Sequence, residues 1–264
     1  MSPSPSSTEP LSAVIARAVA QVESGRPREA LAILDRAIEL LSDDAERAVV
    51  HGYLGRIRLE LGEHTAALAH HERAAAIHGR LGRDAYEAAA LADLAGTSAA
   101  LGQVEKALEY HEREIAIHER TGDRHSRALA LVRVARLGSL AGEPEQARQL
   151  LLETIPTFGE LGDRDGLGSA LWALGKVELM LERDQDAFDH LTDSYKLNLA
   201  LDRLDGICFV GVDLGQLLFA AGQLDEGRQV LARSRDGFVR LGLPDLAQKT
   251  QDVIDALEAD AAGD

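Results

Sequence analysis

The chain has 264 residues, a formal net charge of −16, one cysteine and 4% aromatic residues. The negative charge repels nucleic-acid phosphates and argues against direct binding of DNA or RNA. The single cysteine, Cys208, excludes an internal disulfide and a cysteine-rich metal site. The sequence also lacks an apolar run of about 18 residues, so we expect neither a membrane span nor a membrane partner. These features predict a cytoplasmic protein whose partner is a protein, a peptide or a small-molecule effector.

The first ten residues, MSPSPSSTEP, offer almost nothing to bury and lack the basic and apolar segments of a signal peptide. They are predicted to be a disordered leader, 1 to 10. Residues 11 to 264 are predicted to form a single repeat domain.

Glycine recurs at intervals of twenty residues through most of the chain. The residue before each of these positions is nearly always apolar, as expected where a helix ends in a left-handed residue that glycine adopts without strain. Twenty residues allow one helix and a tight reversal. The repeated positions are Gly62, Gly82, Gly102, Gly122, Gly142, Gly162, Gly222 and Gly242, with Glu182 and Asp202 in the two intervening places.

This spacing predicts thirteen helices and no strand. Proline falls in the first turn of three of them, at Pro27, Pro144 and Pro244, where a missing N–H costs no hydrogen bond. The last helix is predicted to be a C-terminal cap. In chain order the predicted ranges are 11–24, 27–41, 43–61, 64–81, 84–101, 104–121, 124–141, 144–160, 164–181, 184–201, 204–221, 224–241 and 244–260.

Small residues recur at two further positions of the repeat, where neighbouring helices must approach closely. One set is Ala18, Gly55, Ala95, Ala135, Gly175 and Gly215, and the other is Ala30, Ala67, Ala107, Ala147, Ala187 and Gly227. This pattern resembles the tetratricopeptide repeat, in the 40-residue subclass of bacterial signalling regulators and animal polarity adaptors. The resemblance implies an all-α, right-handed superhelical solenoid of about six helical hairpins plus a capping helix.

The resemblance also implies a ligand site in a concave groove lined by the first helix of each hairpin. Carried over by register, the expected ligand-binding residues are Tyr53, Arg56, Arg133, Arg136, Trp172, Lys176, Phe209 and Gln216. Ser139, Met180, Asp213 and Phe219 are placed on the same face. Basic residues and the one tryptophan in an acidic chain favour an acidic ligand with an apolar anchor. Alternatively, the arginines pair with neighbouring acids and Trp172 packs between hairpins.

The only asparagine, Asn198, falls on the second helix of its hairpin, so the backbone clamp common in the family is absent. Histidines repeat at a forty-residue interval, with His71 and His78 followed by His111 and His118. Two residues seven apart on a helix lie roughly 10 Å from each other, too far to share one zinc ion, and we interpret them as packing residues. Cys208 is interpreted as a buried, inert thiol. No catalytic residue, metal or cofactor is predicted.

Two functions fit these features. The first is a non-catalytic scaffold that binds a protein or peptide in the groove. The second is a ligand-sensing regulatory module, similar to the arrays attached to bacterial ATPase-type and antibiotic-pathway regulators. In that second function Pro156, inside the helix 144–160, is the candidate hinge. The preference for Arg over Lys and for Ala, Gly and Leu is typical of a high-GC bacterium, and the oligomeric state stays open.

Overall fold

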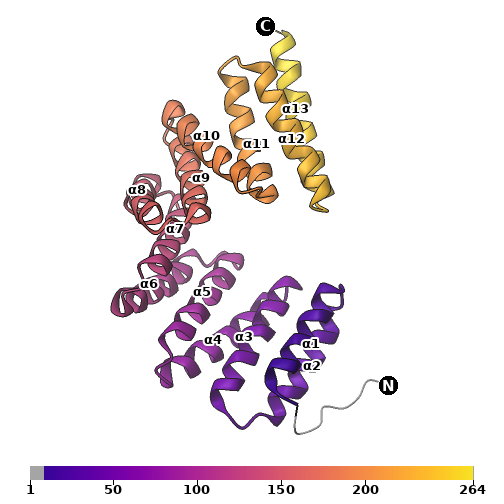
Figure 1. Cartoon of the computed structure of the whole chain (residues 1–264), viewed down its shortest axis with the longest axis vertical. Helices are drawn as coiled ribbons and strands as arrows, with labels where there is room; N and C mark the ends of the chain where they lie inside the picture. Colours follow the sequence, from indigo (N-terminus) through magenta and orange to yellow (C-terminus); the bar gives the residue numbers. More distant parts are fainter. Residues whose placement is uncertain (1–8, 264) are drawn as a thin grey trace. The chain divides into compact units, whose positions relative to one another are not determined.

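The structure, a computed structural model, describes residues 9–263. Its regular elements are helices throughout this range, thirteen in all (Figure 1). The predicted all-α fold and the predicted number of helices are confirmed, and the helix ends agree closely with those expected. Most of the predicted disordered leader lies outside the described residues. Within the described range, no helix has both the length and the apolar character needed to cross a bilayer.

The chain divides into two compact units, Met1–Ala130 and Leu131–Asp264, with the division inside one helix. The first unit contains α1 (Leu11–Glu23), α2 (Pro27–Leu40), α3 (Asp44–Glu60), α4 (His64–Arg80), α5 (Asp84–Ala100), α6 (Val104–Thr121) and the beginning of α7 (Arg124–Leu140). The second contains the remainder of α7 with α8 (Pro144–Leu161), α9 (Arg164–Met180), α10 (Asp184–Ala200), α11 (Leu204–Ala220), α12 (Leu224–Arg240) and α13 (Pro244–Gly263). The interpretation as one domain stays a prediction.

The turns follow the glycine spacing. Gly62 has φ 75°, and its N–H donates to the Leu59 carbonyl at 3.0 Å, which closes the end of α3. Glu182 and Asp202 are the two described non-glycine residues with positive φ, 57° and 53°. They adopt the same left-handed turn, although a Cβ makes this conformation costly. The twenty-residue register therefore continues where glycine is missing.

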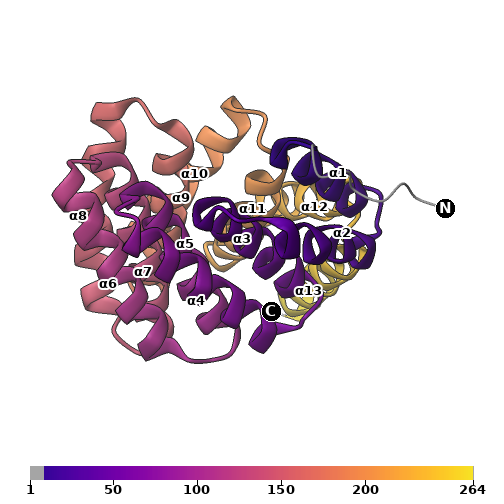
Figure 2. The same ribbon diagram turned by 90° about the horizontal axis from the view of Figure 1, so that it is seen from below.

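The small residues lie where helices of one hairpin meet. A Cβ built on Gly175 of α9 would come within 2.6 Å of Leu191 on α10, so a larger residue would push the two helices apart. Ala147 and Ala187, at the matching position of α8 and α10, are almost completely buried. The helices α9 and α10 lie side by side in both ribbon views (Figures 1 and 2). Close backbone approach thus sets the packing of each pair.

Pro156 lies inside its helix, within the predicted range 144–160, and does not end it early. The helix α8 continues past it to Leu161. Pro156 and Leu152 are both exposed, so the hydrogen bond that the Leu152 carbonyl loses is on the solvent-facing side of the helix. The division between the compact units falls between Ala130 and Leu131, well before this proline.

Ala147→Leu is expected to destabilise the protein by about 1–3 kcal/mol, because the added carbons have no space between the helices. Urea unfolding measures the effect, and Gln146→Leu, at an exposed position of the same helix, is the matched control. Hydrogen exchange should increase first in the neighbouring helices. A variant as stable as the control would show that the small residue is not required.

A histidine pair in the first unit predicts a pH dependence of stability. His51 on α3 and His70 on α4 face each other with their Nδ1 atoms 2.9 Å apart. Burial is the main cause that lowers the pKa of both to about 4. His70 and nearby arginines add to this effect on His51, and Arg58, Arg73 and His71 add to it on His70. The unfolded chain, with a histidine pKa near 6.5, then binds more protons between about pH 4 and pH 6.5. The free energy of unfolding should therefore decrease as the pH falls through this range.

His70→Gln should flatten this decrease, because it removes one titrating ring and keeps a polar side chain. Thermal unfolding at a series of pH values measures it, with His125→Gln, at an exposed position, as the control. An unchanged pH profile in His70→Gln would contradict the assignment.

Candidate ligand-binding site

The predicted aromatic residues of the second unit form one cluster. The rings of Trp172 on α9 and Phe209 on α11 have centroids 6.0 Å apart. Phe209 meets Phe238 of α12 edge to face at 5.1 Å. Trp172 is half-buried and Phe209 is exposed, so the cluster presents aromatic surface to solvent. We call the side formed here by α9, α11 and α13 the binding face.

Charged groups hold Trp172 in place from three directions. The indole N–H donates a hydrogen bond of 2.7 Å to Asp213 on α11. The Arg136 guanidinium lies 5.9 Å from the ring centroid and the Lys176 ammonium 5.6 Å from it. Both distances are within the range of cation–π attraction. The ring is thus fixed between one carboxylate and two cations.

Next to this cluster is a hollow of about 190 Å³, which we call the apolar hollow. It is bounded by α9, α11, α12 and α13, and most of its surface comes from hydrocarbon and aromatic groups. Its charged side chains are two lysines and one aspartate. The lining residues are Trp172, Lys176, Phe209, Val212, Asp213, Phe238, Leu246, Lys249, Thr250 and Val253.

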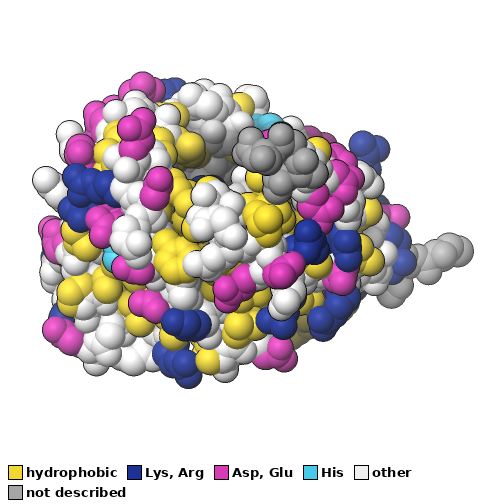
Figure 3. All heavy atoms as spheres, turned by 90° about the horizontal axis from the view of Figure 1, so that it is seen from above, with side chains coloured by type: hydrophobic (Ala, Val, Ile, Leu, Met, Phe, Trp, Pro, Cys, Tyr) yellow, Lys and Arg dark blue, Asp and Glu magenta, His cyan; other side chains and the backbone are white. Residues whose placement is uncertain are grey.

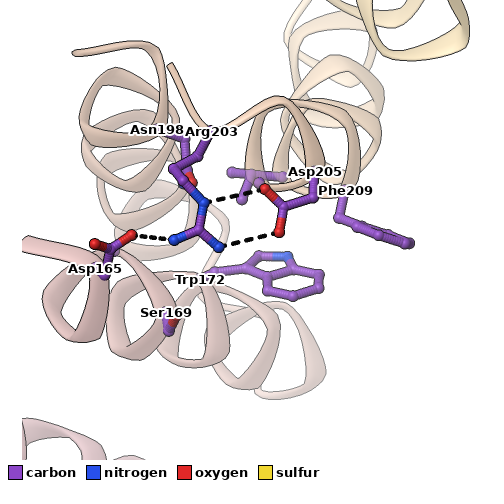
Figure 4. A pocket seen from close by; sticks show the side chains of 10 residues that line it. Asp165, Ser169, Trp172, Asn198, Arg203, Asp205 and Phe209 are labelled. Atoms are coloured by element: carbon purple, nitrogen blue, oxygen red, sulfur yellow. Dashed lines mark hydrogen bonds and ion pairs between the residues drawn. The ribbon is translucent and has the colours of Figure 1, made fainter. Parts of the chain in front are cut away.

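A second, smaller hollow of about 110 Å³ lies on the other side of Trp172 and Phe209. Its charged groups already have partners. Arg203 forms ion pairs with Asp165 and with Asp205, and the three side chains meet above the Trp172 ring (Figure 4). The hydrogen bond from Arg203 lowers the pKa of Asp205. With two carboxylates around one guanidinium, the second hollow offers no unpaired cation to an anionic ligand.

Cations around the apolar hollow lack carboxylate partners. Within residues 9–260, neither Arg136, Lys176 nor Lys249 forms an ion pair. Elsewhere, arginines such as Arg56 and Arg148 are paired, with Asp93 at 2.9 Å and with Glu178 at 2.7 Å. The surface shown in Figure 3 likewise has basic side chains interspersed with acidic ones. The unpaired cations therefore mark the part of this face suited to an anionic group.

The structure brings four of the expected ligand-binding residues together, Arg136, Trp172, Lys176 and Phe209. Gln216 is exposed on α11, but its side-chain amide donates to the Val212 carbonyl of its own helix at 3.2 Å. Arg133 is partly buried on α7.

The two expected ligand-binding residues of the first unit do not belong to the aromatic cluster around Trp172. Tyr53 packs against the core cluster of α1, α2 and α3. Arg56 is paired with Asp93, as the alternative interpretation of the arginines proposed.

Two residues placed on this face by register do not belong to it. Phe219 is only 7% exposed and packs with Leu231 and Ile254. Ser139 is buried, and its hydroxyl donates to the Arg136 carbonyl. Each directly precedes an exposed residue of its helix, Leu140 or Ala220. Successive residues of a helix are rotated by about 100°, which turns these two side chains into the core.

Sequence reasoning missed the contributions of α12 and α13. Phe238 and Lys249 line the apolar hollow, yet α13 was treated only as a cap. Lys249 lies forty residues after Phe209, so extending the register by one repeat would have placed it on the same face.

The repeated histidines are packing residues. His71 is 1% exposed and its Nδ1 lies 3.0 Å from the Thr97 hydroxyl. His111 is 2% exposed and hydrogen-bonds Glu114 through Nδ1 at 2.7 Å. Among the described residues, no group of three or more His, Cys, Asp or Glu side chains is arranged to hold a metal ion. Each of these two rings therefore has a structural partner.

Comparison with known proteins agrees with the repeat pattern seen in the sequence. Residues 86–160 match the family model of the tetratricopeptide repeat. No curated protein matches the chain significantly.

Solved structures resemble the chain over most of its length. Apo RapI is 12% identical, over 96% of this chain and 99% of its own, with a TM-score of 0.71. The Rap conjugation gene regulator of plasmid pLS20, in complex with the Phr* peptide, is 12% identical over 92% of this chain and 74% of its own, with a TM-score of 0.64. PH0952 of Pyrococcus horikoshii, a signal-transduction ATPase with a tetratricopeptide repeat sensor, is 14% identical over 96% of this chain and 43% of its own, with a TM-score of 0.69. At these low sequence identities, the structural similarity shows only that the fold is shared.

The single cysteine gives a direct test of the packing beside this site. Cys208 is fully buried, and burial raises the pKa of its thiol to about 11. At pH 8 we expect a thiol reagent to react about 100-fold more slowly with the native protein than with the protein in urea, because thiolate is the reacting form. Equal rates would show that α11 opens readily at this position.

Proposed function

We propose that this tetratricopeptide-repeat protein is a non-catalytic, cytoplasmic scaffold that binds a segment of another protein at the apolar hollow. The segment carries a large apolar side chain and at least one carboxylate. The apolar group enters the hollow beside Trp172, and the carboxylate is attracted by Arg136, Lys176 and Lys249.

One observation carries this proposal: aromatic surface and unpaired cations occur together on an otherwise strongly acidic protein. Buried aromatic and arginine contacts supply much of the energy in protein interfaces. A carboxylate brought to an unpaired cation gains a partner without breaking an existing ion pair. Arginines already held in ion pairs, such as Arg56 and Arg148, do not offer that gain.

The pLS20 regulator supports a peptide as the kind of ligand, because that protein of similar fold is bound to the Phr* peptide. A regulatory module that senses a ligand is the second candidate. It is favoured by the likeness to PH0952, whose repeats form a sensor. In that case an effector occupies the same hollow.

Selection from a random peptide library displayed on phage tests the proposal. We expect the selected peptides to combine an acidic residue with a large apolar one. Lys176→Glu, at an exposed position without an ion pair, should weaken their binding about fivefold or more, which corresponds to about 1 kcal/mol. Trp172→Phe, which keeps a ring but removes the indole N–H, should weaken it less.

Arg56→Ala is the matched control, because this arginine is exposed in the first unit and already paired. Binding and circular dichroism should both be unchanged in it. If the selected peptides bind Lys176→Glu as tightly as the unmodified protein, the ligand does not use this face. If no peptide is selected, the peptide-binding function is wrong.

A further inference from the structure

The binding face has three levels along α9. Trp172, Lys176 and Met180 are four residues apart, so each is about 6 Å further along the helix than the one before. The first borders the apolar hollow and the second is an unpaired cation. The third is an apolar side chain that is 50% exposed.

The neighbouring helix α7 repeats the second and third levels. Arg136 and Leu140 precede Lys176 and Met180 by one forty-residue repeat. Arg136 lies 5.9 Å from the Trp172 ring, which brings α7 beside α9 at this point. Leu140 is 79% exposed, the highest value among the large apolar side chains described. The face therefore presents apolar, cationic and apolar surface in sequence.

Spacing alone fits two ligand conformations. In an extended peptide, side chains at i, i+2 and i+4 point to one side and are about 6.7 Å apart. In an α-helix, side chains at i, i+4 and i+7 or i+8 share a face, with about 6 Å between successive levels. Both conformations match the levels on α9.

Hydrogen bonding separates these two conformations. An extended peptide exposes its backbone N–H and C=O groups, which need partners on the protein. Several polar side chains near this face already make hydrogen bonds within the protein: Gln216 donates to the Val212 carbonyl, and Asp213 accepts from the Trp172 indole. The amide of Asn198 donates to the Ser194 carbonyl at 2.9 Å. A helical ligand satisfies its own backbone and needs none of these groups.

We infer that the ligand is an amphipathic α-helix from another protein, with an apolar residue, an acidic residue and a second apolar residue on one face. The inference rests on the proposed function. The first apolar residue, at i, enters the apolar hollow. The acidic residue, at i+3 or i+4, meets Arg136 and Lys176. The second apolar residue, at i+7 or i+8, covers Leu140 and Met180.

Three synthetic peptides of about 18 residues, long enough to form a helix, test this inference. The first has leucine, glutamate and leucine at i, i+4 and i+7 on an alanine-rich background. The second has proline at a central position on the opposite face. The third has lysine in place of the glutamate. None contains tryptophan, so the fluorescence of Trp172, the only tryptophan of the chain, reports occupancy of this site.

We expect the first peptide to bind at least tenfold more tightly than the second and the third. Lys176→Glu should reverse the order of the first and third peptides, because it exchanges the charge that the ligand meets. Met180→Ser should weaken the first peptide without changing the Trp172 signal of the free protein.

Equal binding of the first two peptides overturns the helical ligand and leaves the binding function intact. The same conclusion follows if the three peptides fail to bind while peptides selected from the library bind. If neither the designed nor the selected peptides bind, both the inference and the proposed function are wrong. Binding of the first peptide that is insensitive to Lys176→Glu overturns the assigned position of the acidic residue.

Discussion

The close approach of paired helices is the constraint on which the rest of this structure depends. From Gly62 to Gly242, a left-handed residue every twenty positions gives the helices nearly equal lengths, and a small residue on each allows the pair to touch. Residues forty apart then occupy equivalent places on neighbouring hairpins. This is why Arg136 lies beside Trp172 and Lys176, and why Asp213 reaches the indole. The site is thus a consequence of the repeat geometry with unusual side chains at a few positions.

Charge pairing explains why so acidic a chain presents a cationic face. Most arginines that lie near carboxylates are held in ion pairs, as Arg148 is with the fully buried Glu178. A buried carboxylate without such a partner would be costly, so these pairs are required by the packing. Cations left over after this pairing are the ones available to a ligand. Arg136 and Lys176 belong to this group, and both lie against the same aromatic ring.

The fold could be predicted from the sequence because the repeat signals reinforce one another at every hairpin. Even Glu182 and Asp202 keep the turn, since the helices on both sides impose it. The site could be predicted only in part. The repeat register shows which side of a helix faces the groove, but not whether each side chain on that side is exposed or turned into the core. Phe219, which was placed on the groove face and is buried, is an example. The register also does not show which charged side chains form ion pairs, so the ion pair that Arg56 forms with Asp93 was not evident from it. Phe238 was missed because it comes from the second helix of its hairpin.

The walls of the apolar hollow also belong to the protein core, and this affects how the hollow can bind. Phe238 packs against Cys208 and Ala247 on one side and against Phe209 on the other. Helix α13 contributes Ile254 to the core beneath and Lys249 to the hollow. Side chains held by core packing have little freedom to lose when a ligand arrives. The surface proposed to bind the ligand is therefore largely preorganised, because the same helices build the core and line the hollow.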